Sequence, residues 1–151
     1  SYEQVDGDSA SAVELFALLS ALAGVPINQE LAVTGSVNQL GEIQAIGGVN
    51  DKIEGFYNVC KLKGLTGSQG VIIPESNADN LMLDEEVVEA VKNQKFNVYT
   101  VRTVDEGVEL LTGVPAGSLN VDGSYGKDTI NGRVQKRLYE MAKTLQRFDS
   151  L

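Results

Sequence analysis

Glycine and proline divide this sequence into short segments, and their positions limit the possible folds more than any other feature. Breaks occur at Gly24 and Pro26, at Gly47 and Gly48, at Gly64, at Pro74, and at Gly113 and Pro115. No apolar stretch between these breaks approaches the roughly 18 residues that cross a bilayer. We therefore expect one compact domain built from short helices and strands.

Five segments have the apolar spacing of helices, in which buried positions recur every three or four residues. The first starts at Ser9, contains mostly apolar residues, and is closed by Gly24 and Pro26. The predicted helices cover residues 9–23, 49–64, 84–93, 104–111 and 130–148.

Four other segments are typical of strands. Residues 31–37 and 42–46 flank the turn-like sequence Asn38-Gln39-Leu40-Gly41 and predict a β-hairpin. Residues 70–73, which end at Pro74, and the alternating residues 96–101 predict two further strands. The order of helices and strands predicts an α+β fold with helices packed on a mixed β-sheet.

The composition changes after Gly113. Residues 114–128 are rich in glycine, serine, aspartate and asparagine, and we interpret them as a linker between residues 1–113 and a C-terminal helix within residues 129–151. Basic residues gather in this helix among apolar positions, which predicts a solvated helix face. They are Arg133, Lys136, Arg137, Lys143 and Arg147.

The net charge and the cysteine content limit which partners and which cellular compartment we expect for this protein. The net charge of −9 argues against nucleic acid and against anionic membranes as partners. Cys60 is the only cysteine, so no disulfide can form within the chain, and we expect a cytoplasmic protein. Cys60 itself is expected to be a small buried apolar side chain.

The sequence contains no histidine, and this restricts the possible chemistry. Serine and cysteine hydrolases that use a histidine base are excluded, as are histidine-rich metal sites. A hydrolase built from this chain needs a carboxylate or a lysine as its base.

Ser9 lies at the start of the first predicted helix, within Asp6-Gly7-Asp8-Ser9-Ala10-Ser11. The unpaired N–H groups at a helix start could stabilise an oxyanion if Ser9 attacked a carbonyl group. From the local sequence alone, a helix cap formed by Ser9 or Asp8 is the commoner explanation.

Lys52 lies one turn into the second predicted helix, after Gly47 and Gly48. A lysine acts as a base only where its charged form is disfavoured, and Ile46, Val49, Ile53 and Phe56 could supply an apolar wall. The alternative is a solvated lysine that pairs with Asp51 or Glu54.

The sequence resembles the peptidase domain of the Lon protease family in two separate blocks. DGDSAS followed by ELFALLSALAGVPI is similar to the family's serine motif, in the branch that reads Gly-Asp-Ser-Ala-Ser. LAVTGSVNQLGEIQAIGGVNDKIEG resembles the block that holds the family's catalytic lysine, and QGVIIPESN resembles a following strand and loop. The resemblance covers roughly residues 4–113.

The resemblance implies a role for individual residues. Ser9 matches the nucleophile and Lys52 the general base, while Thr34 and Asp6 match supporting residues near the pair; a strand threonine and a turn aspartate also have structural explanations. The backbone N–H groups of Ser9 and Ala10 would bind the oxyanion. A Ser-Lys pair needs no histidine, which agrees with the composition.

The resemblance also implies a wider context. It implies a fold like domain 2 of ribosomal protein S5, a homo-oligomeric ring, usually hexameric, and degradation of unfolded or damaged proteins in the cytoplasm. The family's peptidase domain has strands upstream of its serine, and we expect that residues 1–113 form the carboxy-terminal part of such a domain. No G-x-x-x-x-G-K-[ST] motif occurs, so no cofactor is expected in this chain, and ATP with Mg²⁺ would act only through an ATPase module elsewhere. The alternative function is a non-peptidase scaffold or ring-forming domain beside an ATPase.

Overall fold

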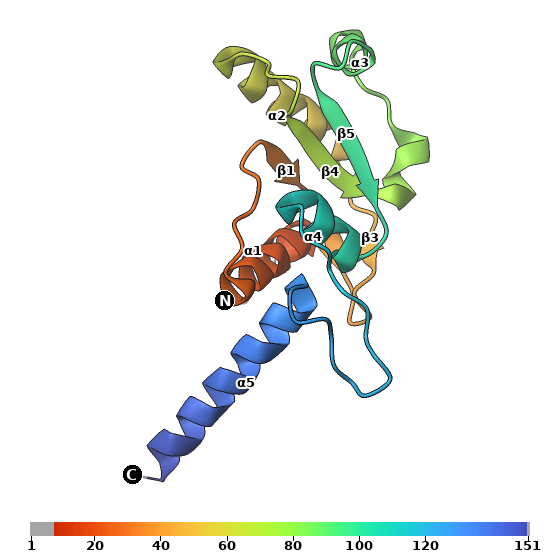
Figure 1. The fold of residues 1–151 in the computed structure, drawn as a ribbon. Helices are drawn as coiled ribbons and strands as arrows, with labels where there is room; N and C mark the ends of the chain where they lie inside the picture. The colour runs from red at the N-terminus through yellow and green to blue at the C-terminus, as the bar shows by residue number, and fades with distance from the viewer. Residues whose placement is uncertain (1–7, 151) are drawn as a thin grey trace, which may run out of the picture.

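The computed structural model describes residues 8–150, in which a small parallel sheet is covered by helices on both faces (Figure 1). Strands β1 (Leu31–Val33), β4 (Gly70–Pro74) and β5 (Asn97–Val101) pair in the order β1-β4-β5, and both pairings are parallel. An antiparallel ribbon of β2 (Ser36–Val37) and β3 (Ile43–Gln44) forms a second sheet, and an isolated antiparallel bridge between Glu42 and Thr103 connects it to the chain just beyond β5. This arrangement is compatible with the predicted α+β class. In the described part of the chain, however, the expected single mixed sheet is instead two sheets.

The predicted hairpin is shorter than expected, because residues 31–37 do not form one strand. Val33 still pairs with β4, whereas Ser36 and Val37 pair with β3. The chain changes partner at Thr34 and Gly35. A Cβ atom on Gly35 would lie 3.1 Å from Ile43 Cγ2, so a side chain here would push the ribbon away by a few tenths of an ångström.

Four helices sandwich the parallel sheet. α1 (Ser11–Ala23) and α4 (Val104–Thr112) share one apolar cluster with one face, and α2 (Val49–Lys63) and α3 (Glu85–Lys92) share a second cluster with the other face. Two short 3₁₀ helices, η1 (Asp8–Ala10) and η2 (Glu75–Asn80), precede α1 and follow β4. The first α-helix therefore begins at Ser11, two residues later than predicted.

The central strand β4 shows how the core is divided. Val71 and Ile73 face α2 and α3, and Ile72 faces α1 and α4, as expected of alternating side chains on a strand. Cys60 packs in the same cluster as Val71 and Ile73, between the sheet and α2 and α3. It is 3% exposed, which confirms the prediction of a buried thiol.

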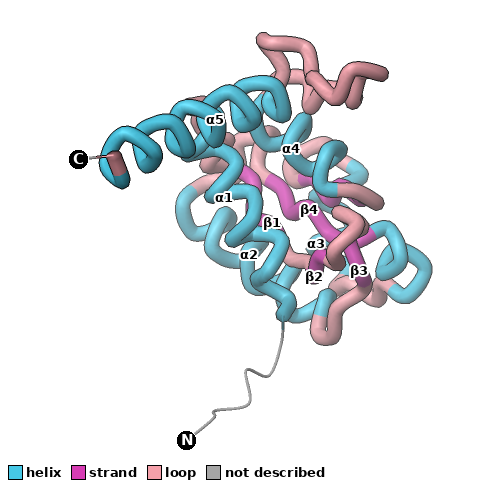
Figure 2. Tube along the Cα trace, turned by 90° about the horizontal axis from the view of Figure 1, so that it is seen from below, coloured by secondary structure: helices cyan, strands magenta, loops and turns pink. Residues whose placement is uncertain are grey.

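The chain from residue 113 to residue 129 contains no helix or strand and leads into α5 (Ile130–Asp149). Only the beginning of α5 is embedded, since Ile130 and Val134 are buried in the cluster around α1 and every residue from 135 to 150 is exposed. The rest of the helix projects away from the body (Figures 1 and 2). The five basic residues predicted to be solvated are all exposed. Among the described residues no helix combines the length and apolarity needed to cross a membrane.

Candidate active site

Ser9 and Lys52, which are 43 residues apart in the sequence, are in direct contact. Lys52 Nζ donates a hydrogen bond to Ser9 Oγ over 2.9 Å. Ser9 lies in η1 at the entrance to α1, and Lys52 lies in the first turn of α2. The fold therefore brings together the two residues that the sequence singled out for chemistry.

The alternative explanation of Ser9 and Asp8 as helix caps is wrong. The N-cap of α1 is Ala10, and no side chain accepts a hydrogen bond there. Asp8 accepts a hydrogen bond from Ser36 Oγ, and the Ser9 hydroxyl accepts one from Lys52. Both side chains are thus used for tertiary contacts instead of local capping.

A pocket of about 280 Å³ lies beside the Ser9–Lys52 contact. Its apolar walls come from α1, β1 and β4, three elements that meet at this edge of the sheet. The lining residues are Ser9, Ala10, Val13, Ala32, Val33, Thr34, Lys52 and Val71. A carbonyl group next to Ser9 would therefore have room for an adjoining side chain in a mostly apolar recess.

The residues predicted to form an apolar wall around Lys52 do not form it. Val49 and Ile53 point into the core between α2, α3 and the sheet, and Val13, Val33 and Val71 line the pocket instead. Lys52 is exposed in the described part of the chain, so the predicted enclosure is absent there. The physical reason is that the side chains of a helix diverge, and those nearest to Lys52 in sequence are needed to pack α2 onto the sheet.

The segment from Gly35 to Val37 holds the Ser9 turn in place, a role that was not predicted from the sequence. The Gly35 N–H donates to the Ser9 carbonyl over 3.0 Å, and the Gly35 carbonyl accepts from the Ala12 N–H over 3.2 Å. Ser36 Oγ donates to Asp8 Oδ2 over 2.6 Å, and the Val37 N–H donates to Ser11 Oγ over 3.1 Å. These four hydrogen bonds tie η1 and the first two residues of α1 to the point where β1 gives way to β2.

A signal for this role was present in the sequence. A glycine between a predicted strand threonine and a serine indicates a bulge or a close approach of another backbone. That signal marks Gly35 but does not identify what approaches it, because the approaching segment lies 26 residues earlier.

Of the other residues predicted for the site, Thr34 and Ala10 line the pocket beside the Ser9–Lys52 contact. Thr34 is 7% exposed and lines the same pocket, but no hydrogen bond joins it to Lys52 among residues 8–150. Ala10 also lines the pocket, beside Ser9. Asp6 lies outside the described residues.

The chemistry available here is that of a hydroxyl and an amine. Within residues 8–150, no group of three or more cysteine, aspartate or glutamate side chains is arranged to hold a metal ion. A serine oxygen within hydrogen-bonding distance of a lysine nitrogen is the geometry of a nucleophile and its base. The site therefore suits acyl transfer.

Comparison with known proteins agrees with this geometry. Residues 4–113 match the family model of the Lon protease (S16) C-terminal proteolytic domain. The chain is 47% identical over 143 residues to a proposed Lon protease homolog of Escherichia coli, a match that covers 95% of the chain and 23% of that protein. The match therefore extends beyond residue 113.

Other relatives give similar results. A proposed Lon protease homolog of Haemophilus influenzae is 44% identical over 138 residues, which cover 91% of the chain and 23% of the relative. The archaeal Lon protease of Methanocaldococcus jannaschii is 37% identical over 111 residues, covering 74% of the chain and 15% of the relative. The chain thus spans less than a quarter of the length of these curated relatives.

Proposed function

The chain belongs to the Lon protease (S16) family, whose C-terminal proteolytic domain it matches, and on this premise we propose that it is a serine endopeptidase in which Ser9 is the nucleophile and Lys52 the general base. The hydrogen bond of 2.9 Å between Ser9 Oγ and Lys52 Nζ carries the proposal. In the structure the lysine donates this bond. When the amine is neutral, the serine hydroxyl donates across the same distance, as a proton transfer requires.

The proposed reaction has two stages. In the first, Ser9 Oγ attacks the peptide carbonyl carbon while its proton passes to Lys52 Nζ, and the lysine then protonates the departing amine as the C–N bond breaks. In the second, Lys52 takes a proton from water and the water oxygen attacks the ester. The Ser9–acyl bond then breaks to release the acid, and Lys52 returns its proton to Ser9 Oγ, which restores the starting pair. The backbone N–H groups of Ser9 and Ala10 would stabilise the oxyanion in both stages.

The pocket supports a polypeptide substrate. Its apolar walls suit an aliphatic side chain next to the cleaved bond, and such side chains are accessible in unfolded or damaged proteins. A bound polypeptide would also cover the exposed Lys52 and exclude water from its contact with Ser9. Substrate binding would thereby supply the enclosure that the described residues lack.

We extend the proposal to the whole protein by family resemblance. The chain would form part of a domain with the fold of ribosomal protein S5 domain 2, in a homo-oligomeric, hexameric ring in the cytoplasm. An ATPase module outside this chain would use ATP and deliver unfolded proteins. Residues 1–113 would belong to the peptidase domain, with Thr34 and Asp6 supporting the Ser-Lys pair, and residues 114–128 would link the domain to the C-terminal helix.

Two substitutions test the catalytic pair in the complete polypeptide that contains this chain, with casein as an unstructured substrate. Ser9→Ala should abolish cleavage, because the ester intermediate cannot form, and should change the free energy of unfolding by less than about 1 kcal/mol. Lys52→Arg should also be inactive, because arginine does not release its proton.

Matched controls are available on the exposed surface. Lys63→Arg at the end of α2 and Ser118→Ala in the connection to α5 make the same chemical changes away from the pocket, and both should retain activity. Cleavage by the Ser9→Ala or Lys52→Arg protein would refute the proposal. The scaffold function would then be the better account.

A further inference from the structure

The exposed part of α5 carries a narrow apolar stripe that no other element in the described chain covers. Its members are spaced alternately by three and four residues from Val134 onward. They are Val134, Leu138, Met141, Leu145 and Phe148. Val134 is 9% exposed against α1, whereas the exposed fractions of the next four are 51%, 44%, 66% and 71%. The stripe is therefore buried where α5 meets its own body and unpartnered beyond it.

The spacing of the stripe identifies the kind of surface that fits it. An alternation of three and four residues is a repeat of 3.5, which keeps a seam facing one partner helix along its length. The stripe is only about 80° wide at 3.6 residues per turn. A face that packs on a globular core is wider than about 100°. The partner is consequently a helix.

The positions of the apolar residues along α5 identify the helix. Leu138 and Phe148 lie five residues on either side of Lys143, and Met141 and Leu145 lie two residues on either side of it. A second copy of α5 laid antiparallel about Lys143 would place Leu138 opposite Phe148, and Met141 opposite Leu145. The stripe is thus complementary to itself under a twofold axis.

Charge favours the same antiparallel arrangement. α5 carries five basic and two acidic residues, although the whole chain has a net charge of −9, so the body at its base is strongly acidic. Parallel helices would bring two acidic bodies to the same end of the pair, and antiparallel helices place them at opposite ends.

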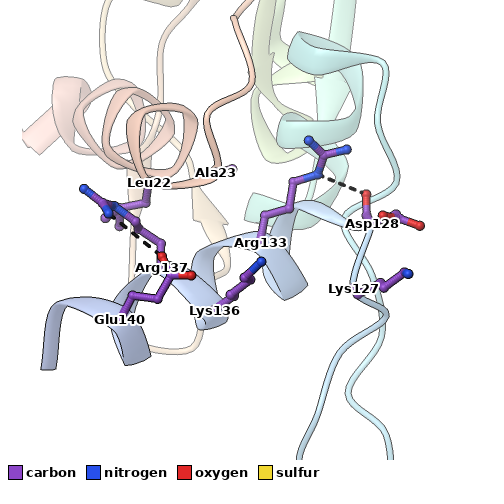
Figure 3. Close-up of a pocket in the computed structure, with 8 residues that line it drawn as sticks. All are labelled: Leu22, Ala23, Lys127, Asp128, Arg133, Lys136, Arg137 and Glu140. Atoms are coloured by element: carbon purple, nitrogen blue, oxygen red, sulfur yellow. Dashed lines mark hydrogen bonds and ion pairs between the residues drawn. The ribbon is translucent and has the colours of Figure 1, made fainter. Parts of the chain in front are cut away.

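The basic side chains do not obstruct the stripe. Arg133, Lys136 and Arg137 instead line a cleft of about 380 Å³ beside the end of α1 (Figure 3). There Arg133 Nε donates to the Asp128 carbonyl, and Arg137 pairs with Glu140.

We propose that α5 is an interaction surface that joins two copies of this chain through an antiparallel helix pair centred on Lys143. Each large apolar side chain buries on the order of 100 Å². The four from each copy then bury roughly 800 Å² in total, below the roughly 1,200 Å² of stable specific interfaces and in the range of weak, transient ones. The pair is therefore reversible and dissociates on dilution. It lies outside residues 4–113 and does not depend on the proposed peptidase activity.

Sedimentation of the 151-residue chain, apart from the complete polypeptide for which a ring is proposed, tests the pair over a range of concentrations. The wild-type chain should dimerise reversibly. In the double variant Leu138→Gln/Leu145→Gln the dimer dissociation constant should rise at least tenfold, because glutamine preserves helix propensity but removes the apolar contacts of the stripe. Tyr139→Gln is the matched control, since Tyr139 is 62% exposed on the same helix but lies about 100° around it from Leu138. Helix content measured by circular dichroism should be the same in all three proteins.

Several results would overturn the proposal. One is a wild-type chain that stays monomeric at about 0.5 mM, a concentration at which a pair with a Kd of about 0.1 mM would be mostly dimeric. Another is an equal loss of dimer in the Tyr139→Gln chain. A dimer that disappears in 0.5 M NaCl would show instead that α5 docks on the acidic body of the second copy. Vesicles of anionic lipid that bind the monomer through the same leucines would show that the stripe serves a membrane.

Disulfide trapping tests the direction of the pair. Leu138→Cys and Phe148→Cys chains, mixed and oxidised, should cross-link to each other, whereas each alone should not. Two copies of residue 138 would lie about 15 Å apart along an antiparallel pair, beyond the reach of a disulfide. Cys60 is buried and does not compete. Self-linked chains of each variant would show a parallel pair and refute the proposed arrangement.

Discussion

Replacing Ser36 with alanine should disturb catalysis without touching the proposed catalytic pair. Ser36 is 3% exposed and donates to the Asp8 carboxylate over 2.6 Å, and Asp8 is the residue immediately before Ser9. A hydrogen bond to a charged acceptor is worth about 1.5–3 kcal/mol. Because Asp8 is exposed and water can replace the lost donor, we expect the lower figure, about 1.5 kcal/mol.

That free energy sets the expected effect on activity. If the Ser36–Asp8 bond holds η1 in the position that joins Ser9 to Lys52, a loss of about 1.4 kcal/mol lowers the population in that position tenfold. The value of kcat should then fall by up to about tenfold while KM changes little, since the pocket walls are intact. Three other hydrogen bonds still tie residues 9–12 to residues 35–37, so the fold should remain.

The assay compares casein cleavage with the rate at which a fluorophosphonate probe labels Ser9, and both should fall together. Ser124→Ala is the matched control, because Ser124 Oγ donates to Asp122 over the same 2.6 Å in an exposed loop. Wild-type kcat in the Ser36→Ala protein would refute the reasoning. An equal loss in the Ser124→Ala protein would show that the effect is not specific to the site.

Three further predictions concern stability. Gly107→Ala should destabilise the chain by about 2–3 kcal/mol in urea denaturation, because the new Cβ would lie 2.4 Å from Phe16 Cζ in the core; an unchanged midpoint would contradict this packing. Burial raises the pKa of the Cys60 thiol, with Glu30 adding to the rise and Lys63 opposing it, so stability should be fully present below pH 9.0 and decline as the pH rises through the folded pKa. A Cys60→Ala chain should lose that alkaline decline. Arg102 lowers the pKa of Glu75 through a hydrogen bond, so this pair should stabilise the fold above about pH 4.5 and progressively less in acid, and Arg102→Gln should remove that dependence in melts between about pH 3 and 6.

The helices and the strands β4 and β5 could be predicted from local sequence. Apolar spacing and glycine or proline breaks depend on residues within one or two turns, and they located α2, α4 and α5 to within about two residues. The absence of histidine likewise restricted the possible bases from composition alone. The resemblance to a peptidase family rested on two separate blocks of sequence, each of them contiguous.

The division of residues 31–37 between two sheets depends on long-range packing. Local pattern predicts a strand but does not specify its partner, and here β4 competes with β3 for adjacent residues. The same competition positions Gly35 and Ser36 against the Ser9 turn. Their role could therefore not be predicted without knowing these partners.

The amino-acid sequence sets which side chains this protein can use for chemistry, namely a serine and a lysine but no histidine. It also sets the apolar stripe on the last helix. The packing of the elements brings Ser9 and Lys52 to 2.9 Å, leaves Lys52 exposed, and selects the residues that form the pocket beside it. The physical reason is the separation in sequence of the residues that make contact. Spacing along a chain reports contacts within a helix or strand, whereas a site built from α1, β1, α2 and β4 depends on how those elements pack.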